Sequence, residues 1–343
     1  MPSTIDIQII ETDDAFFALE PVWNHVLSQC NNNSVFLTWE WIETWWMVYA
    51  ADYRLAVLLA FEDGRPSAIA PLVIRRREKP RLEFFGQNQA YGEYLGFLVP
   101  AGRETDLIGA FCSRLADMRR QGLWETMAFA VVREDQLEFQ VICDRLTQLG
   151  ITTQKLEPRI SPVAHLAPSW QSYVAGLDRQ FVRRIEYNLR RLSRIGPIRF
   201  EMAATSDECR TFFDDFIDMN NERWQRPMDE TFIAFHRRIA SRFLPLGRLA
   251  LARLSLAGKP IAVKYDYIFD NKVWGYQGGW DRAFAKYEVG SVLLYKLLAH
   301  AATTGLEAYD FLEGNEWYKR RWSNRQIVAR DIVHGEAGPS IVF

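Results

Sequence analysis

The feature that most constrains the fold of this chain is a pattern that occurs twice. Residues 55–74 contain two apolar runs on either side of Gly64, and residues 249–269 contain two more on either side of Gly258. Apolar runs that flank a glycine turn predict a β-hairpin, because glycine readily takes the positive φ that such turns require. The sequence therefore predicts one hairpin of the same kind in each half of the chain.

The similarity continues after each hairpin. In the first half, an amphipathic helix is predicted over residues 105–122 and a strand over 125–132. In the second half, a helix is predicted over 291–305 and a strand over 308–312. Each helix is closed by a glycine. Duplication of one α/β domain is the simplest explanation, and chance is the alternative, because glycine turns and amphipathic helices are common.

The length of the chain agrees with two domains. The chain has 343 residues, of which 48% are hydrophobic, and a single core stops growing at about 250–300 residues. Residues 157–162 include two prolines and have the composition of a connection. We therefore expect one α/β domain at residues 1–158 and another at residues 159–343.

The overall charge indicates no partner, but one segment is strongly basic. The 41 Lys and Arg residues nearly cancel the 43 Asp and Glu residues, leaving a net charge of -2, so no overall field attracts nucleic acid or membranes. Residues 179–199 contain seven arginines and a single acid, Glu186. The apolar spacing predicts a helix whose arginines either bind an anionic substrate or RNA, or form a solvated surface.

A candidate anion site lies where the second repeated helix begins. The residues there are Tyr287, Glu288, Val289, Gly290 and Ser291. A glycine lets a phosphate approach the main chain, a serine can cap the helix, and the helix dipole favours negative charge. Glycine followed by serine is also an ordinary helix start, so a phosphate site and a simple cap both remain open.

A second candidate site follows the last predicted strand. Asp310, Glu313, Tyr318 and Lys319 lie within ten residues of one another. A carboxylate can take a proton from an amine, a tyrosine can return a proton to a leaving group, and a lysine can hold phosphate or carboxylate. The alternative is an exposed polar loop whose aromatic residues belong to the core.

Several other chemistries and locations have no sequence signal. The five histidines show no metal-ligand spacing, the four cysteines form no C-x-x-C pair, and no Gly-x-Ser-x-Gly elbow occurs. We therefore expect no metal. No apolar run approaches the 18–20 residues, roughly, that cross a bilayer, and no secretory signal is evident. These features predict a cytoplasmic location without a membrane span.

An ordered set of motifs resembles one family. The set spans most of the chain and resembles CelD-like acyltransferases of the GNAT superfamily, which are similar in architecture to Fem-type aminoacyl-tRNA-dependent peptidyltransferases. The motifs are Phe36-Leu-Thr-Trp-Glu-Trp41 with Trp45-Trp46, Ile69-Ala-Pro-Leu72, the basic stretch 184–191, Asn221-Glu-Arg-Trp224, Glu288-Val-Gly290, Asp310-Phe-Leu-Glu-Gly314 and Tyr318-Lys-Arg-Arg-Trp322.

The resemblance implies a tandem GNAT fold, with two mixed-sheet α/β domains in one chain. It places acyl-CoA, with acetyl-CoA as the expected donor, between splayed strands of the second domain. The donor diphosphate would meet main-chain amides at residues 287–291. This loop departs from the family's Q/R-x-x-G-x-G/A pattern, because it has a single glycine and the acidic Glu288. The first domain is expected to be structural or to bind the acceptor.

The resemblance also implies a mechanism and a set of roles. An acceptor amine, or less readily a hydroxyl, would attack the donor carbonyl directly, without a covalent enzyme intermediate. Asp310 or Glu313 would take the amine proton, and Tyr318 would protonate the leaving thiolate. Main-chain amides at Gly278 and Gly279 would polarise the carbonyl. The residues expected to bind substrate are Arg184, Asn188, Arg191, Trp224, Gln277, Lys319 and Trp322.

Three functions follow as hypotheses. The first is an acyltransferase that acts on a polysaccharide precursor, an amino sugar or a similar metabolite. The second is a Fem-like transferase, for which the basic helix would contact tRNA; nucleic acid is expected only in this case. The third is a non-catalytic protein that binds a glycan or a partner and regulates polysaccharide synthesis. The sequence leaves the oligomeric state undefined.

Overall fold

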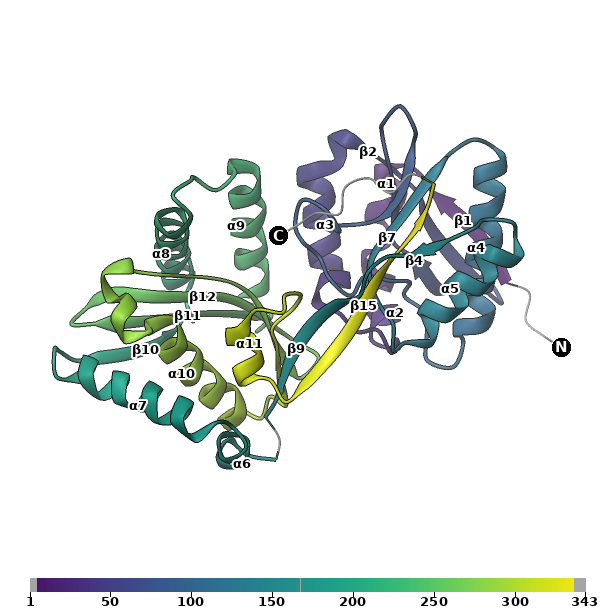
Figure 1. The fold of residues 1–343 in the computed structure, drawn as a ribbon. Coiled ribbons are helices and arrows are strands. Elements are labelled where there is room, and N and C mark those ends of the chain that lie inside the picture. Colours follow the sequence, from purple (N-terminus) through teal and green to yellow (C-terminus); the bar gives the residue numbers. More distant parts are fainter. Residues whose placement is uncertain (1–4, 167, 336–343) are drawn as a thin grey trace. The chain divides into compact units, whose positions relative to one another are not determined.

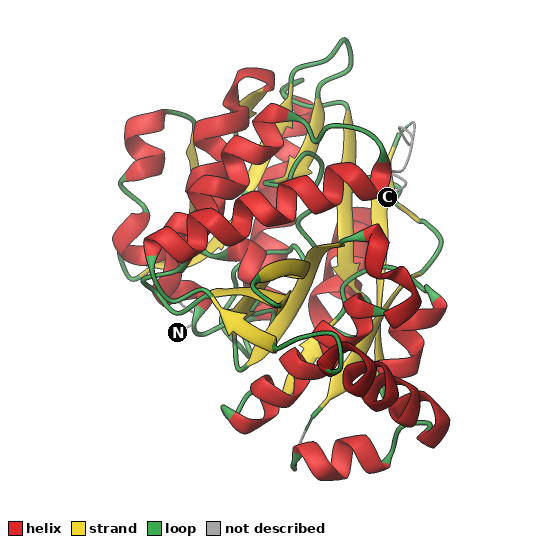
Figure 2. Cartoon of the chain, turned by 90° about the vertical axis from the view of Figure 1, so that its left-hand side faces the viewer, coloured by secondary structure: helices red, strands yellow, loops and turns green. Residues whose placement is uncertain are grey.

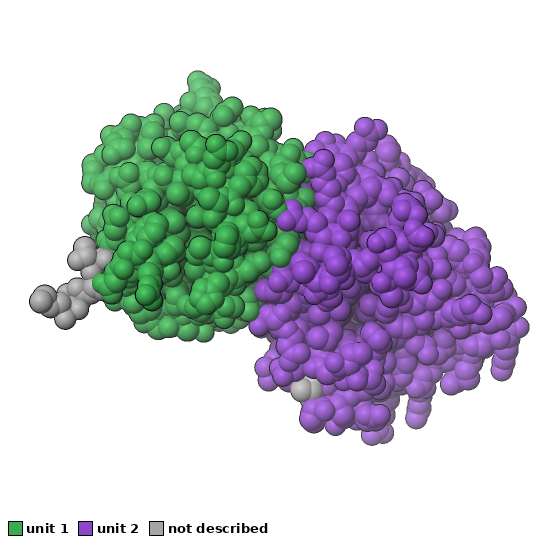
Figure 3. Space-filling view, turned by 180° about the vertical axis from the view of Figure 1, so that it is seen from behind, with its two compact units in different colours: residues 1–159, 327–343 green, residues 160–326 purple. Residues whose placement is uncertain are grey.

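The computed structural model describes residues 5–166 and 168–335, and the chain divides into two compact units (Figure 3). Unit 1 consists of the residues up to Arg159 together with those from Ile327 onward, and unit 2 consists of Ile160–Gln326. The first boundary lies one residue beyond the expected one. The assignment of the C-terminal residues to the second half needs correction, because the last strand pairs with strands of unit 1.

Unit 1 combines two groups of strands with helices packed against them (Figure 1). β1, β3 and β4 form a three-stranded sheet, while β15, β7, β6, β5 and β2 follow one another at one end of a 12-stranded sheet, with β8 on β15. The strands are β1 (Ile5–Ile10), β2 (Tyr53–Leu55), β3 (Val57–Glu62), β4 (Arg65–Ala70), β5 (Leu72–Arg75), β6 (Arg81–Phe84), β7 (Thr126–Arg133), β8 (Gln154–Lys155) and β15 (Arg325–His334). The helices are α1 (Asp13–Phe17), α2 (Glu20–Leu27), η1 (Val35–Leu37), α3 (Trp39–Tyr49), η2 (Ala50–Asp52), α4 (Glu104–Arg120) and α5 (Leu137–Gln148).

Unit 2 is built on a mixed part of the 12-stranded sheet, with the strand order β10-β11-β12-β13-β14-β9. The strands are β9 (Arg159–His165), β10 (Ile198–Met202), β11 (Leu249–Leu256), β12 (Lys259–Phe269), β13 (Lys272–Trp280) and β14 (Ala308–Asp310). The helices are α6 (Trp170–Ala175), α7 (Arg179–Ser193), α8 (Ser206–Trp224), α9 (Glu230–Phe243), η3 (Arg282–Tyr287), α10 (Val289–Thr303) and α11 (Trp317–Trp322). Figure 2 shows the helices of the chain, in red, packed against its strands, in yellow.

The repeated pattern of the sequence is a repeated structure. The β3–β4 hairpin turns at Asp63 and Gly64, with φ angles of 50° and 75°. The β11–β12 hairpin turns at Ala257 and Gly258, with φ angles of 50° and 83°. In each unit a helix then connects the only parallel strand pair described there, α4 between β6 and β7 and α10 between β13 and β14. Both predicted hairpins and both helix-strand units are confirmed.

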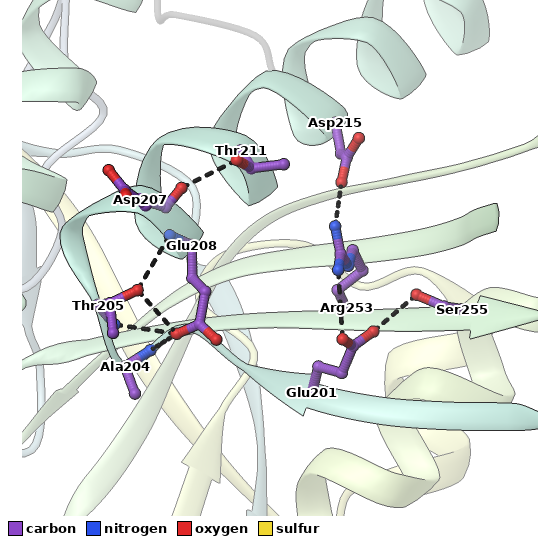
Figure 4. Close-up of polar contacts among 9 residues, drawn as sticks. All are labelled: Glu201, Ala204, Thr205, Asp207, Glu208, Thr211, Asp215, Arg253 and Ser255. Carbon is purple, nitrogen blue, oxygen red and sulfur yellow. Dashed lines mark hydrogen bonds and ion pairs between the residues drawn. The ribbon is translucent and has the colours of Figure 1, made fainter. Parts of the chain in front are cut away.

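Helices cover the two faces of the unit 2 sheet. α8 and α9 lie over one face, and α10 with α6 and α7 lies over the other (Figure 1). The side chain of Arg253 on β11 joins α8 to the sheet, because it donates to Asp215 of α8 at 3.0 Å and to Glu201 of β10 at 3.2 Å (Figure 4). Thr205 and Glu208 form a capping box that fixes where α8 begins. α8 is therefore held in place at both its start and its middle.

A β-bulge distorts β13 in the middle of the sheet. Tyr265 of β12 pairs with Gln277, but Tyr267 pairs with Trp274, so that two residues of β13 face the single residue Asp266. A bulge bends its strand and increases the local twist. β14 pairs with β13 only as far as Trp274, so the two parallel strands separate where the bulge begins. We call this separation the β13–β14 opening.

Candidate functional site

One wall of the β13–β14 opening is an unpaired strand edge. The amide of Asp281 donates to Ile261 of β12. Because amides alternate in direction along an antiparallel ladder, those of Gly278 and Trp280 point away from β12, toward the opening. Among the described residues, no strand pairs with this edge beyond Trp274. The opening therefore offers free main-chain donors to a bound molecule.

The two glycines of this wall have different surroundings. A side chain at Gly279 would lie 2.7 Å from Cβ of Met219 and 3.1 Å from the amide nitrogen of Asn220, both in α8. A side chain at Gly278 would instead lie 3.0 Å from Cδ of Lys264. Gly279 is thus needed for packing against α8. Of the two amides expected to polarise a carbonyl, that of Gly278 faces the opening, whereas that of Gly279 faces β12.

The start of α10 carries two free amides. Glu288 is the N-cap and adopts a left-handed conformation with φ 50°, and no side chain caps the helix. The amides of Ser291 and Val292 both donate to the carbonyl of Glu288. Ser291 therefore lies inside the first turn and is not the cap that the sequence predicts. Val289 and Gly290 retain amides without an acceptor among the described residues.

The basic helix α7 supplies cations to this helix start. Nε of Arg184 lies 3.1 Å from the carboxylate of Glu288. The guanidinium of Arg191 lies over the ring of Tyr287, 4.6 Å from its centroid, and donates to the carbonyl of Lys286 at 3.5 Å. Arg184 and Arg191, expected on the acceptor side, thus lie beside the expected donor loop. We call Arg184, Arg191 and Lys286 the basic group.

Asn188 has a supporting position. It is buried, with 4% exposed, and its side-chain oxygen accepts from Arg191 at 3.3 Å. It therefore orients Arg191 and does not face solvent as a substrate-binding residue would. Helix periodicity contains the signal for this, because residues 181, 185, 188 and 192 lie on one face of α7.

A buried carboxylate lies at the closed end of the opening and has no sequence signal. Asp266 is fully buried in β12. Its Oδ2 accepts from the hydroxyl group of Tyr309 at 2.7 Å, and its Oδ1 accepts from the amide of Tyr276 at 2.9 Å and lies 3.1 Å from Nζ of Lys264. Burial raises the pKa of Asp266, against the lowering effects of Lys264 and the hydrogen bonds. Asp266 lies opposite the bulge of β13, which no sequence pattern marks.

Tyr318 of α11 lies near this network. Desolvation of its hydroxyl raises the pKa of Tyr318 to about 12, with further raising effects from Glu316 and Asp266 and a lowering effect from Arg223. The residue is 41% exposed. Tyr318 is therefore protonated at neutral pH, its side chain is only partly exposed, and it lies close enough to Asp266 for the two groups to interact. These properties agree with the expected role of a proton donor.

The two expected proton acceptors differ in accessibility. Asp310 ends β14 and is 1% exposed, and its Oδ1 accepts from the amide of Leu312 at 2.9 Å. Leu312 has a positive φ of 57°, so this bond supports a strained turn. Glu313 is half-buried in the loop that follows. The geometry therefore favours Glu313 over Asp310 as the group that a substrate can reach.

Two other residues that were expected to contact the substrate, Lys319 and Trp322, are instead packed within the protein. Lys319 is buried; its ammonium group donates to the carbonyl of Glu313 and lies 3.3 Å from the carboxylate of Glu316, so it holds the loop before α11. Trp322 is fully buried and packs against Phe181, with the two ring centroids 4.7 Å apart. Trp322 is therefore a core residue and not the substrate contact that the sequence predicts.

The remaining predicted contacts are Gln277 and Trp224. Gln277 is half-buried and pairs with Tyr265 in the ladder next to the bulge, which places it beside the opening. Trp224 ends α8, and its side chain lies outside the described part of the structure.

Unit 1 has a different arrangement between its parallel strands. Residues 85–103 separate β6 from α4, whereas the short segment 281–288 separates β13 from α10. Leu98, within that long segment, pairs with Ile69 of β4 and is buried together with Phe97. Buried side chains therefore lie on the approach to α4, in contrast to the half-exposed start of α10.

Two features are absent from the described ranges 5–166 and 168–335. No group of three or more His, Cys, Asp or Glu side chains is placed to hold a metal ion there. No helix in those ranges is long and apolar enough to cross a membrane.

Comparisons with known proteins identify the fold. Residues 179–320 match a family model described as an acetyltransferase (GNAT) domain, and no curated protein matches the sequence. The structure is similar to that of FemX, with a TM-score of 0.68 and 11% identity over 96% of each chain. It is also similar to a tandem GNAT protein from the clavulanic acid biosynthesis pathway, with a TM-score of 0.54 and 11% identity over 98% of this chain and 100% of the other.

A third similar structure is the C-terminal domain of a putative lysylphosphatidylglycerol synthetase from Agrobacterium fabrum. It has a TM-score of 0.52 and 12% identity, over 78% of this chain and 81% of the other. At these identities the likeness concerns the fold. The chain thus has a mixed α/β fold similar to that of a tandem GNAT protein, and its residues 179–320 match the family model of a GNAT acetyltransferase domain.

Proposed function

We propose that unit 2 transfers an acyl group from an acyl-CoA, in the simplest case acetyl-CoA, to the amine of a small acceptor. The observation that carries this proposal is the β13–β14 opening, whose free amides at Gly278 and Trp280 continue toward the free amides of Val289 and Gly290. An elongated thioester carrier with phosphates at one end fits main-chain hydrogen-bond donors that are arranged in this way.

The phosphate end of the donor would lie at the start of α10. The loop has one glycine where the family pattern has more, but the basic group adds cationic side chains beside the two free amides. A helix N-terminus and arginine side chains both favour phosphate. Arg184 and Arg191 are therefore proposed to bind the phosphates of the acyl donor. Tyr287, under Arg191, would hold that side chain in place.

The remainder of the donor would extend along β13. The pantetheine arm of CoA contains amide groups, which can pair with a free strand edge in the way an added β-strand does. Gly278 and Trp280 would provide that edge. The thioester carbonyl would then lie at the closed end of the opening, near the bulge.

Transfer would proceed by direct attack of the amine on the thioester carbon. A new C–N bond forms, the C–S bond breaks, and the amine proton passes to a carboxylate, for which Glu313 is the accessible candidate. The amide of Gly278 would stabilise the oxyanion of the tetrahedral intermediate. Tyr318 would supply a proton to the departing thiolate. No covalent enzyme intermediate is required.

The acceptor class rests on the resemblance to CelD-like proteins. It favours an amino sugar, a polysaccharide precursor or a similar metabolite. A Fem-like transferase is the second candidate, favoured by the exposed arginines Arg183 and Arg190 of α7 and Arg194, which follows it. A non-catalytic regulator of polysaccharide synthesis is the third, since the loop before α10 has only one glycine.

Calorimetry with acetyl-CoA, longer acyl-CoAs and aminoacyl-tRNA tests the three candidates. The proposal predicts saturable binding of CoA thioesters that weakens about tenfold in Arg184→Ala and Arg191→Ala. Arg190→Ala, which removes the same charge from an exposed site on α7, serves as the matched control. Binding of aminoacyl-tRNA without binding of CoA would support the second candidate instead. Binding of neither ligand would refute both transferase assignments.

A further inference from the structure

The point at which β13 and β14 stop pairing is spanned by a side-chain hydrogen bond. Tyr309 lies opposite Val273 in the parallel ladder, one residue before the last pair, Trp274 with Asp310. Its hydroxyl group crosses over β13 and donates to Asp266 on β12 at 2.7 Å. Two strands that flank β13 are thus joined to each other across it.

Gly275 makes this crossing possible. A side chain at Gly275 would lie 2.5 Å from the ring of Tyr309 and 2.6 Å from its hydroxyl oxygen. Gly275 has no positive φ, so its backbone conformation does not require glycine. The absence of a side chain is therefore explained by the tyrosine ring that lies against it.

Asp266 connects three strands. It accepts from Tyr309 of β14 and from the amide of Tyr276 in the bulge of β13, and it pairs with Lys264 of its own strand β12. A buried carboxylate costs several kcal/mol in desolvation, roughly, and such a group often contributes more to a specific arrangement than to stability. The side chains of Asp266 and Tyr309 are both fully buried, so neither touches a substrate.

Lys264 extends the network to the wall of the opening. It pairs with Gly278 in the β12–β13 ladder, and its Cδ lies 3.0 Å from the place a side chain at Gly278 would occupy. The chain of contacts therefore runs from Tyr309 through Asp266 and Lys264 to the glycine whose amide faces the opening.

We infer that the Tyr309–Asp266 hydrogen bond is a clamp that sets the separation of β13 and β14 and so positions the Gly278 amide against the donor carbonyl. Tyr309 and Asp266 are positioning residues, and Gly275 provides the space for the clamp. The inference rests on the proposed function for its catalytic consequence. The structural part of the inference, that the clamp controls the separation of β13 and β14, does not depend on the proposed function.

The test compares Tyr309→Phe, Asp266→Asn and Gly275→Ala with Tyr173→Phe in the full chain. Tyr173 is a matched control, because it is buried in the same unit and its hydroxyl also donates one hydrogen bond, to the carbonyl of Trp322. Hydrogen exchange of the amides in residues 274–280 is measured without ligand. Faster exchange in the three clamp variants, but not in the control, is the expected result.

Kinetics provide the second measurement. A displacement of about 1 Å can lower a rate by about 100-fold, so kcat is expected to fall about 10- to 100-fold while the Kd for the donor changes less than about twofold. Tyr309→Phe and Asp266→Asn should be non-additive in the double variant, because each removes the same bond. A merely structural bond would lower thermal stability as in Tyr173→Phe and leave kcat per folded molecule unchanged.

The outcomes separate the two proposals. Unchanged exchange in residues 274–280 of all three variants would overturn the clamp, whatever the kinetics. Faster exchange with unchanged kcat would overturn its positioning role. If the wild-type protein binds and transfers no acyl group from any CoA thioester, the proposed function fails, and the exchange experiment still decides whether the clamp controls the strand separation.

Discussion

Arg184 of α7 places its guanidinium 3.1 Å from the carboxylate of Glu288, the residue that caps α10 in a left-handed conformation. The carboxylate is thus paired with a cationic side chain next to the helix start, where Val289 and Gly290 have free amides. It also adds negative charge where the helix dipole favours an anionic ligand. If the loop binds a phosphate as proposed, the Glu288 carboxylate is expected to weaken that binding.

Glu288→Gln is expected to tighten donor binding. The substitution removes a negative charge from the helix start and releases Arg184, and a charge at such a position contributes about 0.3–1 kcal/mol. The Kd for CoA measured by calorimetry at low salt should fall roughly two- to fivefold. Glu307→Gln makes the same charge change beyond the other end of α10 and should leave the Kd unchanged. Weaker binding in Glu288→Gln would contradict a phosphate site at residues 287–291.

Gly290 and Gly279 should respond differently to alanine. A side chain at Gly290 would make only an ordinary 3.5 Å contact with Trp280, so Gly290→Ala should fold normally and weaken donor binding by covering the amides. Gly279→Ala would push against α8 and should destabilise unit 2 by about 1–3 kcal/mol. Thermal unfolding and calorimetry on both variants test this difference. Equal effects on stability would show that the two glycines have the same role.

The elements around these glycines were accessible to sequence reasoning because their signals are local. Alternating apolar runs, glycines 64 and 258 at turns, and apolar stripes of helical period define the hairpins and α4 and α10 without reference to the rest of the chain. The basic face of α7 was accessible for the same reason. Its position beside residues 286–288 was not, because it depends on how α7 packs against α10.

The features that depend on tertiary pairing had no local signal. The bulge in β13 is a mismatch between two strands, so neither strand alone reveals it. The burial of Asp266, Lys319 and Trp322 follows from that packing and from helices on both faces of the sheet. The return of β15 to unit 1 is a pairing between residues roughly 200 positions apart. His236, fully buried among the hydroxyl groups of Tyr265, Tyr267 and Tyr276, is a further example.

Tyr318→Phe is expected to lower kcat about 100-fold, as the loss of a general acid commonly does. Because the pKa of Tyr318 is raised to about 12, the hydroxyl group stays protonated across the measurable range. The pH profile of wild-type kcat should therefore show no loss attributable to Tyr318 below about pH 10. Tyr187→Phe, on exposed α7, is the control. A variant Tyr318→Phe with wild-type kcat would remove Tyr318 from the mechanism.

The roles of Glu313 and Asp310 can be distinguished by replacing each carboxylate with its isosteric amide. Asp310→Asn keeps a side-chain oxygen that can accept from the amide of Leu312, so it should retain most activity, whereas Asp310→Ala should destabilise the turn. Glu313→Gln keeps the shape but cannot take a proton, and its kcat should fall at least about tenfold. Thiol release from the donor, with a panel of amine acceptors, measures each rate. Loss of activity in Asp310→Asn with a normal Glu313→Gln would exchange the two roles.

The buried carboxyl group of Glu138 is expected to give the free energy of unfolding of unit 1 an unusual dependence on pH. Its carboxyl is buried near the start of α5, where it accepts from the amide of Phe97 and the side chain of Asn32, and burial raises the pKa of Glu138 to about 8. A raised pKa means that the folded state holds a proton that the unfolded state has released. Between the ordinary value of 4.5 and about 8, the free energy of unfolding should therefore fall as pH rises, by at most about 1.4 kcal/mol per pH unit from this group.

Glu138→Gln should remove this slope. The amide cannot ionise but also offers one acceptor fewer, so the variant should be less stable than wild type at pH 5.5 and more stable at pH 8.5, and the two curves should cross. Hydrogen exchange of α5 amides reports unit 1 without interference from unit 2. Glu104→Gln removes a carboxylate from the same neighbourhood and should keep the wild-type slope. Parallel profiles for wild type and Glu138→Gln would show that Glu138 is ionised in the folded protein across this range.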